Sequence, residues 1–514
     1  MPADHRATAS ARHRSSETAS RSAVISLRWN IAGSVVIVLL QLGYTAYTAR
    51  AVDARAYGVY AITLTVVPFF GYFANAGLSA CVLRSECLTL PFVRAARRLG
   101  MVSGAVCFLL VEAVAPVFGS FFHMPDLTVM ARLLACVFLV QPSANVTVAA
   151  MRRAGAAPMA VLTESLGQAV GVATAAGLLV CGWNPFALAL AQPVAAAVAL
   201  SVGTVWVTRR PLPPGPPVRA RDLLAPSGFM TSHSLGQFIT NNIPLWASGR
   251  LLGPGAAGSY SRASLFTGLL LMFLYQGINW ALTPLLAERR AEGLRFRQDA
   301  QRTLCAASAV AFIGFGITAG IGPAVLRLLL GPGWEPAVAL VPVLSATAAM
   351  TLLCYCGGLI DQVRNAPRAL LGTLTVTVVA TVAGVAAAAF AQALLLVAAA
   401  AAAGQGVGHL VQLAAWHRSG LMRAGAALRL HGVHLAVGAA LGGAAALGSA
   451  DRPAPAALGC GLVAILPVVL VCVLLRGRIP VFAVAVATGL LRSRRSLTSP
   501  LPSSAATDPS DPPR

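Results

Sequence analysis

The feature that most limits how this chain can fold is a series of roughly fourteen apolar runs, each about 20 residues long. A helix of that length crosses the hydrocarbon core of a bilayer with every backbone polar group bonded internally. The composition agrees, because 57% hydrophobic and 11% charged residues leave too little polar surface to cover a soluble globule of 514 residues. We therefore predict an all-α integral membrane protein with about 14 transmembrane helices.

The apolar runs are separated by short polar connections. Ala-rich tracts such as residues 397–408 are interpreted as membrane helix, because small residues let neighbouring helix backbones approach closely. The predicted spans are residues 30–48, 57–79, 99–120, 128–150, 159–181, 185–207, 228–249, 257–280, 303–323, 337–360, 369–390, 392–415, 433–449 and 457–475.

The polar segments divide the chain into six predicted parts. The N-terminal segment lacks the apolar core of a signal peptide and is expected to be a disordered cytoplasmic tail. The parts are the N-terminal tail (1–28), a first six-helix bundle (29–207), a Pro- and Arg-rich cytoplasmic linker (208–226), a second six-helix bundle (227–415), two additional transmembrane helices (416–475) and a cytoplasmic C-terminal tail (476–514).

The net charge of +22 comes from arginine, since the chain contains no lysine. If the connections alternate sides, 31 of the 38 arginines fall on one side together with both tails. That distribution follows the positive-inside rule and predicts a multi-pass plasma-membrane protein with both termini in the cytoplasm. It also accounts for the basic balance without nucleic acid, which we do not expect as a partner.

The ten cysteines lie mostly in or beside apolar helices, where cysteine behaves as a small hydrophobic residue. The sequence has neither a CxxC pair nor a histidine cluster beside a cysteine, so nothing in it indicates a metal site. We therefore expect no metal and no cofactor.

A weak internal repeat relates residues 50–77 to residues 250–277 without a gap. Each copy covers the end of one helix, a short outer loop and the start of the next helix. Because six predicted helices separate the copies, the two halves would enter the membrane in the same orientation, as parallel repeats. The identical pairs are Arg50 and Arg250, Ala56 and Ala256, Gly58 and Gly258, Tyr60 and Tyr260, Phe73 and Phe273, and Gly77 and Gly277.

Three stretches resemble a known family: residues 48–84 (TARAVDARAYGVYAITL…), residues 247–270 (ASGRLLGPGAAGSYSRASLFTGLL) and residues 365–374 (NAPRALLGTL). They are similar to the polysaccharide exporters, the O-antigen and exopolysaccharide flippases of the MATE-like flippase superfamily. The resemblance covers about residues 25–420 and implies a twelve-helix core and a lipid-linked oligosaccharide cargo. The first repeat departs from the family pattern, with AVDARAYG where LLGPxxxG would be usual.

Polar residues follow one face of two helices that the repeat makes equivalent. In the seventh span His233, Gln237 and Asn241 recur every four residues. In the first span a similar stripe is formed by Asn30, Ser34, Gln41, Thr45 and Thr48. Polar side chains in membrane helices are costly and tend to face a cavity, so the paired stripes predict a substrate cavity. Hydrogen bonds between helices are the alternative for any single residue.

Two arginines are candidates for contact with a phosphate. Arg262, in the motif SYSRA near the start of the eighth span, could neutralise a pyrophosphate as it crosses. Arg28, at the cytoplasmic end of the first span, could receive the headgroup first. The alternative for Arg262 is that its side chain extends to the outer membrane interface.

Two acids lie within predicted spans and are candidates for ion coupling. Glu112 lies two-thirds along the third span, and Glu164 lies about two turns into the fifth. A buried carboxylate is expected to be protonated or paired, so either could bind a proton or sodium ion. A structural hydrogen bond to a neighbouring helix is the alternative.

These features favour a flippase that moves a lipid-linked oligosaccharide or polysaccharide precursor by alternating access. We do not expect an enzyme, because no acidic pair, nucleophile motif or phosphate-binding loop is present. A MATE-like multidrug exporter, a membrane sugar polymerase or ligase, and a non-transporting scaffold are the alternatives. Expected partners are the lipid-linked glycan and membrane lipids, while a glycan polymerase or glycosyltransferase partner stays open.

Overall fold

The computed structural model describes residues 29, 33, 35–75, 78–84, 88–210, 213–215, 228–288, 290, 293–449 and 453–474. Helices dominate these residues, and none of them forms a strand. The predicted all-α membrane architecture is confirmed, with two six-helix halves and two further helices. Eight of the described helices are long and apolar enough to cross a membrane, and two shorter apolar helices, Val35–Ala51 and Pro455–Pro467, accompany them.

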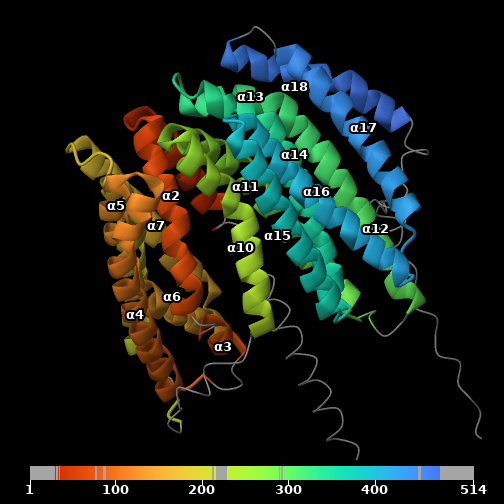
Figure 1. Cartoon of the computed structure of the whole chain (residues 1–514). Helices are drawn as coiled ribbons and strands as arrows, with labels where there is room; N and C mark the ends of the chain where they lie inside the picture. Colours follow the sequence, from red (N-terminus) through yellow and green to blue (C-terminus); the bar gives the residue numbers. More distant parts are fainter. Residues whose placement is uncertain are drawn as a thin grey trace, which may run out of the picture.

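The first half lies at the left of Figure 1, in red to yellow. Its helices are packed mainly through α4, α6, α7 and α8, with α2 against α4 and α5. The elements are the helix Val35–Ala51, α2 (Ala54–Asn75), the short α3 (Leu78–Arg84), α4 (Leu90–Phe122), α5 (Pro125–Ala135), α6 (Val137–Arg153), α7 (Ala157–Val180) and α8 (Ala187–Arg209).

The second half lies beside the first, in green to blue. Here α14 is central and packs against α11, α13 and α16, while α15 packs against α10 and α16. The elements are α10 (Gly228–Ala247), the π-helix η1 (Ser248–Leu252), α11 (Pro254–Glu288), α12 (Leu294–Ala309), the π-helix η3 (Val310–Gly314), α13 (Phe315–Leu330), α14 (Glu335–Val363), α15 (Pro367–Phe390) and α16 (Leu394–Arg418).

Helices occur at all fourteen predicted spans, but several are longer than the apolar run that predicted them. Helix α4 begins at Leu90 rather than near residue 99. The Thr89 hydroxyl caps it by accepting from the Phe92 amide (3.4 Å), and Pro91 suits the first turn. The helix therefore continues into a polar segment that an apolar window does not detect.

The two halves meet where the internal repeat predicted equivalent elements, at the beginnings of α2 and α11. A Cβ on Gly58 would collide with the Pro254 carbonyl, and a Cβ on Gly258 would collide with the Ala54 carbonyl. Each of these contacts is the other shifted by 200 residues, so the pair is self-complementary, as at a two-fold interface. Glycine at both positions lets the helix backbones approach closely.

Arg50 and Arg250, the two arginines that the repeat relates, each contact the opposite half. Arg50 donates to the Leu328 carbonyl at the end of α13 (3.3 Å). The Arg250 guanidinium lies 5.5 Å from the centre of the Phe121 ring, at the end of α4. Each arginine thus reaches the opposite half, as parallel repeats require.

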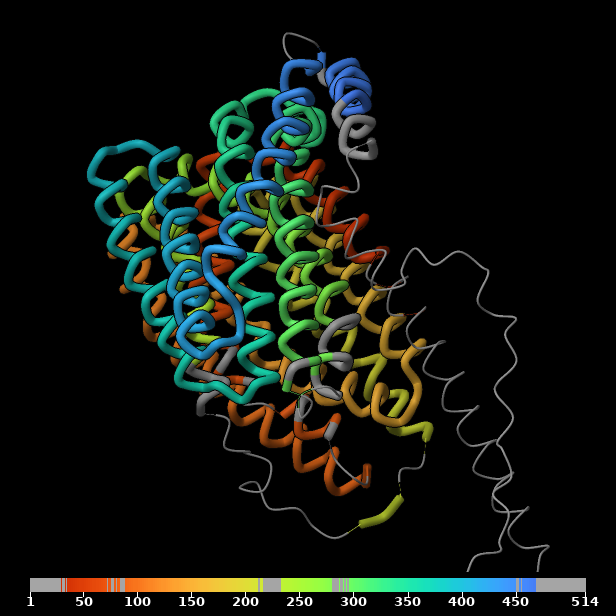
Figure 2. The backbone as a smooth tube through the Cα atoms, turned by 90° about the vertical axis from the view of Figure 1, so that its right-hand side faces the viewer, coloured from red at the N-terminus to blue at the C-terminus, as the bar shows by residue number. Residues whose placement is uncertain are grey.

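The last two helices, α17 (Ala424–Ser449) and α18 (Ala454–Leu474), cover one side of the second half (Figures 1 and 2). Their contacts are mainly with α13 and with each other. A Cβ on Gly316 or Gly320 of α13 would collide with the backbone of Gly438 or Gly442 of α17. This small-residue contact docks α17 tightly on the second half.

Replacing Gly58 or Gly258 by alanine should lower the stability of the folded protein by about 1–3 kcal/mol, because the added methyl meets a backbone carbonyl that cannot rotate away. The measurement is the apparent melting temperature of purified protein in detergent. Gly255→Ala is the control, since a Cβ at that position of α11 meets open space. Equal melting temperatures for all three variants would contradict the proposed packing.

Candidate functional site

The polar face predicted on α10 lines a hollow of about 330 Å³, which we call the α10 hollow. The structure brings His233, Gln237 and Asn241 together on its wall, as their spacing predicted. Helices α11 and α14 supply the opposite wall. The lining residues are His233, Ser234, Gln237, Phe238, Asn241, Asn242, Tyr275, Cys354, Tyr355, Gly358 and Gln362.

A second hollow of about 230 Å³, the α11 hollow, adjoins the first. The two share Asn241 and Tyr355, and the Asn241 amide donates to the Tyr355 hydroxyl (2.9 Å). Besides these two shared residues, the polar residues that line the second hollow are Thr240, Tyr260, Ser264, Thr267, Thr347, Thr351 and Gln405.

Both hollows are lined by neutral groups. Their described linings contain amides, hydroxyls, aromatic rings and one histidine, but no Asp, Glu or Arg. Such a lining suits a neutral ligand that is rich in hydrogen-bonding groups. Sequence reasoning missed Tyr355, Gly358 and Gln362, although their spacing of three and four residues marks one face of α14.

Arg262 lies outside both hollows, at the contact between the halves. Its side chain is 2% exposed, so it is buried within the protein. One guanidinium nitrogen donates to the Thr48 hydroxyl (2.8 Å), and the guanidinium carbon lies 3.5 Å from the centre of the Tyr57 ring. Trp334 lies on another side at 5.4 Å. The cation is therefore held between the first half and the beginning of α14.

No carboxylate among the residues that the structure describes forms an ion pair with the Arg262 guanidinium. The cation–π contact and the charged hydrogen bond each contribute about 2 kcal/mol. Moving a cation out of water costs several kcal/mol. The contacts and the desolvation cost are of similar size, so the buried charge of Arg262 adds little net stability in this conformation.

The other predicted arginine and the first polar stripe are only partly placed. Arg28 and Asn30 lie outside the described residues. Gln41 is partly buried and lines neither hollow. The far end of its stripe does reach Arg262, through the Thr48 hydroxyl.

Both predicted coupling acids form ion pairs away from the hollows. Glu112 on α4 pairs with Arg132 on α5 (3.3 Å), and its side chain is 31% exposed. Glu164 on α7 pairs with Arg152 on α6 (2.7 Å), and its side chain is 36% exposed. Each carboxylate is thus paired, one of the two states expected of an acid in a membrane span.

A buried polar cluster in the second half was not predicted. Three histidines lie in it, His409 on α16 and His431 and His434 on α17, and all are buried. The signal was present, because His409 with Gln412 and His431 with His434 are polar pairs at i, i+3 within apolar helices. No group of three or more metal-binding side chains was found in the part of the chain that the structure describes.

Comparison with known proteins identifies relatives for this arrangement. A family model described as "Polysaccharide biosynthesis protein" matches residues 48–339. The succinoglycan biosynthesis transport protein ExoT of Rhizobium meliloti (strain 1021) is 24% identical over 343 residues, which are 63% of this chain and 66% of that protein. The lipopolysaccharide biosynthesis protein WzxC of Escherichia coli (strain K12) is 23% identical over 362 residues, 67% of this chain and 68% of that protein. The match to these relatives thus spans about two thirds of their length.

Among solved structures, the lipid II flippase MurJ in an inward closed conformation has a similar fold. The TM-score is 0.65, and the alignment covers 89% of this chain and all of that one (100%). The sequence identity is 8%, so the likeness concerns the fold.

Replacing Arg262 by methionine should leave the folded protein as stable as the wild type or more stable, because it removes the cost of a buried charge while keeping an unbranched side chain. Thr48 keeps its hydrogen bond to the Tyr44 carbonyl (2.7 Å) in this variant. The measurement is the apparent melting temperature in detergent. A clear loss of stability would assign Arg262 a structural role instead.

Proposed function

Because this chain belongs to the polysaccharide biosynthesis protein family, we propose that it is a flippase, which moves a lipid-linked oligosaccharide or polysaccharide precursor across the plasma membrane by alternating access. The observation that carries this proposal is the neutral, hydrogen-bonding lining of the α10 and α11 hollows. Amide, hydroxyl and aromatic groups match the hydroxyl-rich surface of a sugar.

Alternating access requires two bodies that can move about a common contact. The reciprocal glycine contact between α2 and α11 supplies such a point, because it joins the halves through closely spaced backbones. As the bundles rock, this contact would open at one stage of the cycle and close at another, and the sugar would pass between the bundles while the lipid tail stays in the bilayer.

Arg262 is proposed to meet the phosphate of the carrier lipid when the halves separate. In the present conformation Tyr57, Trp334 and Thr48 hold its guanidinium. A phosphate offers a desolvated guanidinium bidentate, charge-assisted hydrogen bonds that these neutral groups do not. Anion binding would therefore favour the separated state. Arg28 is proposed to meet the headgroup earlier.

The orientation and partners are proposed from charge and family. Arginine-rich connections on one side favour cytoplasmic termini, with residues 208–226 as a cytoplasmic linker between the bundles. A glycan polymerase or glycosyltransferases would act before or after the flipping step. Glu112 and Glu164 are weaker candidates for ion coupling, because their arginine partners already neutralise them.

The alternatives fit the hollows less well. A MATE-like exporter of cationic drugs would be served by an acidic group in the cavity, whereas no carboxylate lines either hollow in the described part of the chain. A sugar polymerase or ligase would need a group for general acid or base catalysis beside its acceptor. In the described linings the groups of this kind are His233 and the tyrosine and cysteine side chains, and no carboxylate accompanies them there.

Replacing Asn241 by leucine together with Tyr355 by phenylalanine should slow translocation by tenfold or more, since each lost polar contact to sugar is worth about 1–3 kcal/mol. The assay follows the transfer of a radiolabelled undecaprenyl-pyrophosphate oligosaccharide between leaflets of protein-containing vesicles. Gln168→Leu, which removes an amide from the exposed face of α7, is the control. Wild-type rates no greater than those of protein-free vesicles would refute the function, and unchanged rates in the double variant would refute the site.

Replacing Arg262 by methionine should slow the same translocation at least tenfold, and Arg262→Lys should recover part of the rate by restoring the charge. Arg327→Met is the matched control, because Arg327 is an exposed arginine in the last turn of α13, next to the residue that Arg50 contacts. Equal rates for Arg262→Met and the control would exclude the assigned role.

A further inference from the structure

The buried cluster in the second half is a continuous chain of hydrogen bonds across four helices. The Nε2 atoms of His409 and His431 lie 3.1 Å apart. The Ser308 hydroxyl on α12 lies 2.7 Å from His431 Nδ1 and 2.9 Å from His434 Nδ1. At the other end, Gln412 Oε1 lies 3.4 Å from His409 Nδ1.

The chain ends on a buried carboxylate. Gln412 Nε2 donates to Asp361 Oδ2 on α14 (3.4 Å), and the Trp416 indole donates to Asp361 Oδ1 (2.8 Å). Nη1 of Arg364, the residue directly after α14, lies 3.5 Å from Asp361 Oδ1. Gly357 leaves the space that the Gln412 amide occupies, because a Cβ there would overlap it.

The donors and acceptors allow one consistent set of neutral tautomers. The carboxylate takes the Gln412 NH₂ group, so the Gln412 oxygen accepts from His409 Nδ1–H. His409 Nε2 then accepts from His431 Nε2–H, and His431 Nδ1 accepts from the Ser308 hydroxyl. Ser308 in turn accepts from His434 Nδ1–H, so every donor points towards Asp361.

One atom of this chain is left with a free lone pair. His434 Nε2 is buried and has no hydrogen-bond partner, and His434 itself is 0% exposed. In the tautomers above, this nitrogen is an acceptor. A buried acceptor without a donor is costly, so this nitrogen would accept a hydrogen bond from a water or hydronium ion that came within reach, could take a proton from it, and would then donate to the water that remains.

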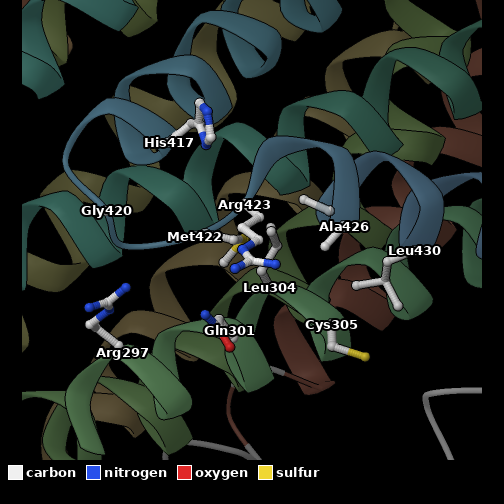
Figure 3. Close-up of a pocket in the computed structure, with 11 residues that line it drawn as sticks. Arg297, Gln301, Leu304, Cys305, His417, Gly420, Met422, Arg423, Ala426 and Leu430 are labelled. Atoms are coloured by element: carbon white, nitrogen blue, oxygen red, sulfur yellow. The ribbon is translucent and has the colours of Figure 1, made fainter. Parts of the chain in front are cut away.

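A hollow of about 570 Å³ approaches the chain from the end of the bundle where α12 begins. Figure 3 shows Arg297, Gln301 and Cys305 on α12, facing Arg423 and Leu430 across it. Ser308 follows Cys305 by one turn, and His434 follows Leu430 by one turn on α17. The hollow therefore brings solvent within about one helical turn of the chain.

We propose that Ser308, His409, His431 and His434, with Gln412 and Asp361, form a proton relay that couples proton binding to movement of the second half; the coupling rests on the proposed flippase function. A proton taken up at His434 Nε2 displaces the Nδ1 proton to Ser308, whose own proton passes to His431 Nδ1. The His431 Nε2 proton then passes to His409 Nε2. One proton enters, every hydrogen bond from His434 to His409 reverses, and His409 becomes an imidazolium.

The Asp361 carboxylate offsets the new charge through Gln412, so α14 and α16 bind each other more tightly in the protonated state. The same two helices line the hollows through Gln362, next to Asp361, and Gln405, one turn before His409. Protonation would thus favour one packing of the cavity walls over another.

Other charged or ionisable groups lie on the elements packed around the relay. They include Asp299, Arg302 and Cys305 on α12, Cys356 on α14, Arg364 just after α14, His417 and Arg418 on α16, and Arg429 on α17, with Arg423 just before α17.

The first test is nitrogen NMR of the full chain labelled with ¹⁵N-histidine in lipid vesicles, with the relay signals assigned by single His→Gln variants. As the pH is lowered from about 8 to about 3.5, a range set by the burial of these rings, His409 should become doubly protonated. In the same step His431 should change from the Nε2–H to the Nδ1–H tautomer, and His434 from Nδ1–H to Nε2–H. In Ser308→Ala the His434 tautomer should no longer follow that of His431. Three rings that keep neutral, unchanged tautomers over this range would overturn the relay.

The second test is flipping of the labelled undecaprenyl-pyrophosphate oligosaccharide in vesicles under an imposed pH gradient of about one unit. The gradient should change the wild-type rate by up to about tenfold for one proton per cycle. It should have no effect in His409→Gln, and full effect in the control His123→Gln, which replaces an exposed histidine just after α4 in the first half. Flipping that ignores the gradient in the wild type would overturn the coupling but leave the flippase function standing. Absence of flipping would refute that function, with the relay still judged by the NMR result.

Discussion

The close contact of α2 with α11 is the interaction on which the rest of the arrangement depends. Gly58 and Gly258 remove the side chains that would hold the two helices apart, and each lies against a carbonyl of the other half. In lipid, the burial of apolar side chains between helices gives no hydrophobic driving force. Close backbone packing of this kind is therefore a main source of helix association. The same junction contains Arg262 and the contacts of Arg50 and Arg250 with the opposite half. It also contains the Trp334 indole, which donates to the Ala49 carbonyl (3.0 Å).

The two halves share a topology but differ in their polar content. In the second half, neutral hydrogen-bonding groups line two adjoining hollows, and a buried histidine chain runs behind them between α12, α14, α16 and α17. Helices α14 and α16 contribute to both features. A change of charge in the histidine chain would therefore act directly on the walls of the hollows, without a longer path through the fold.

Buried polar groups in this protein are handled in two physically different ways. Arg262 is surrounded by aromatic rings and a hydroxyl, which stabilise the charge only in part. The histidine chain instead satisfies nearly all of its donors and acceptors, with Asp361 held by Trp416, Gln412 and Arg364. The first arrangement leaves a cation that gains from meeting an anion. The second leaves one acceptor, His434 Nε2, that gains from meeting a proton.

Sequence alone determined the membrane class, the positions of the fourteen helical spans, the parallel repeat and the polar face of α10, because hydropathy and helical periodicity are local properties. It did not determine what those faces meet. Arg262 proved to be buried against Tyr57, more than 200 residues away in the chain, and His409 proved to contact His431 only because α17 docks on α13 through glycines. Such contacts depend on how helices pack side by side, and in lipid that packing is decided by small-residue shape complementarity, which leaves little trace in composition or period. Only the tertiary structure therefore decided which polar residues line the hollows, that the charge of Arg262 is buried between the halves, and which histidines form a hydrogen-bonded chain.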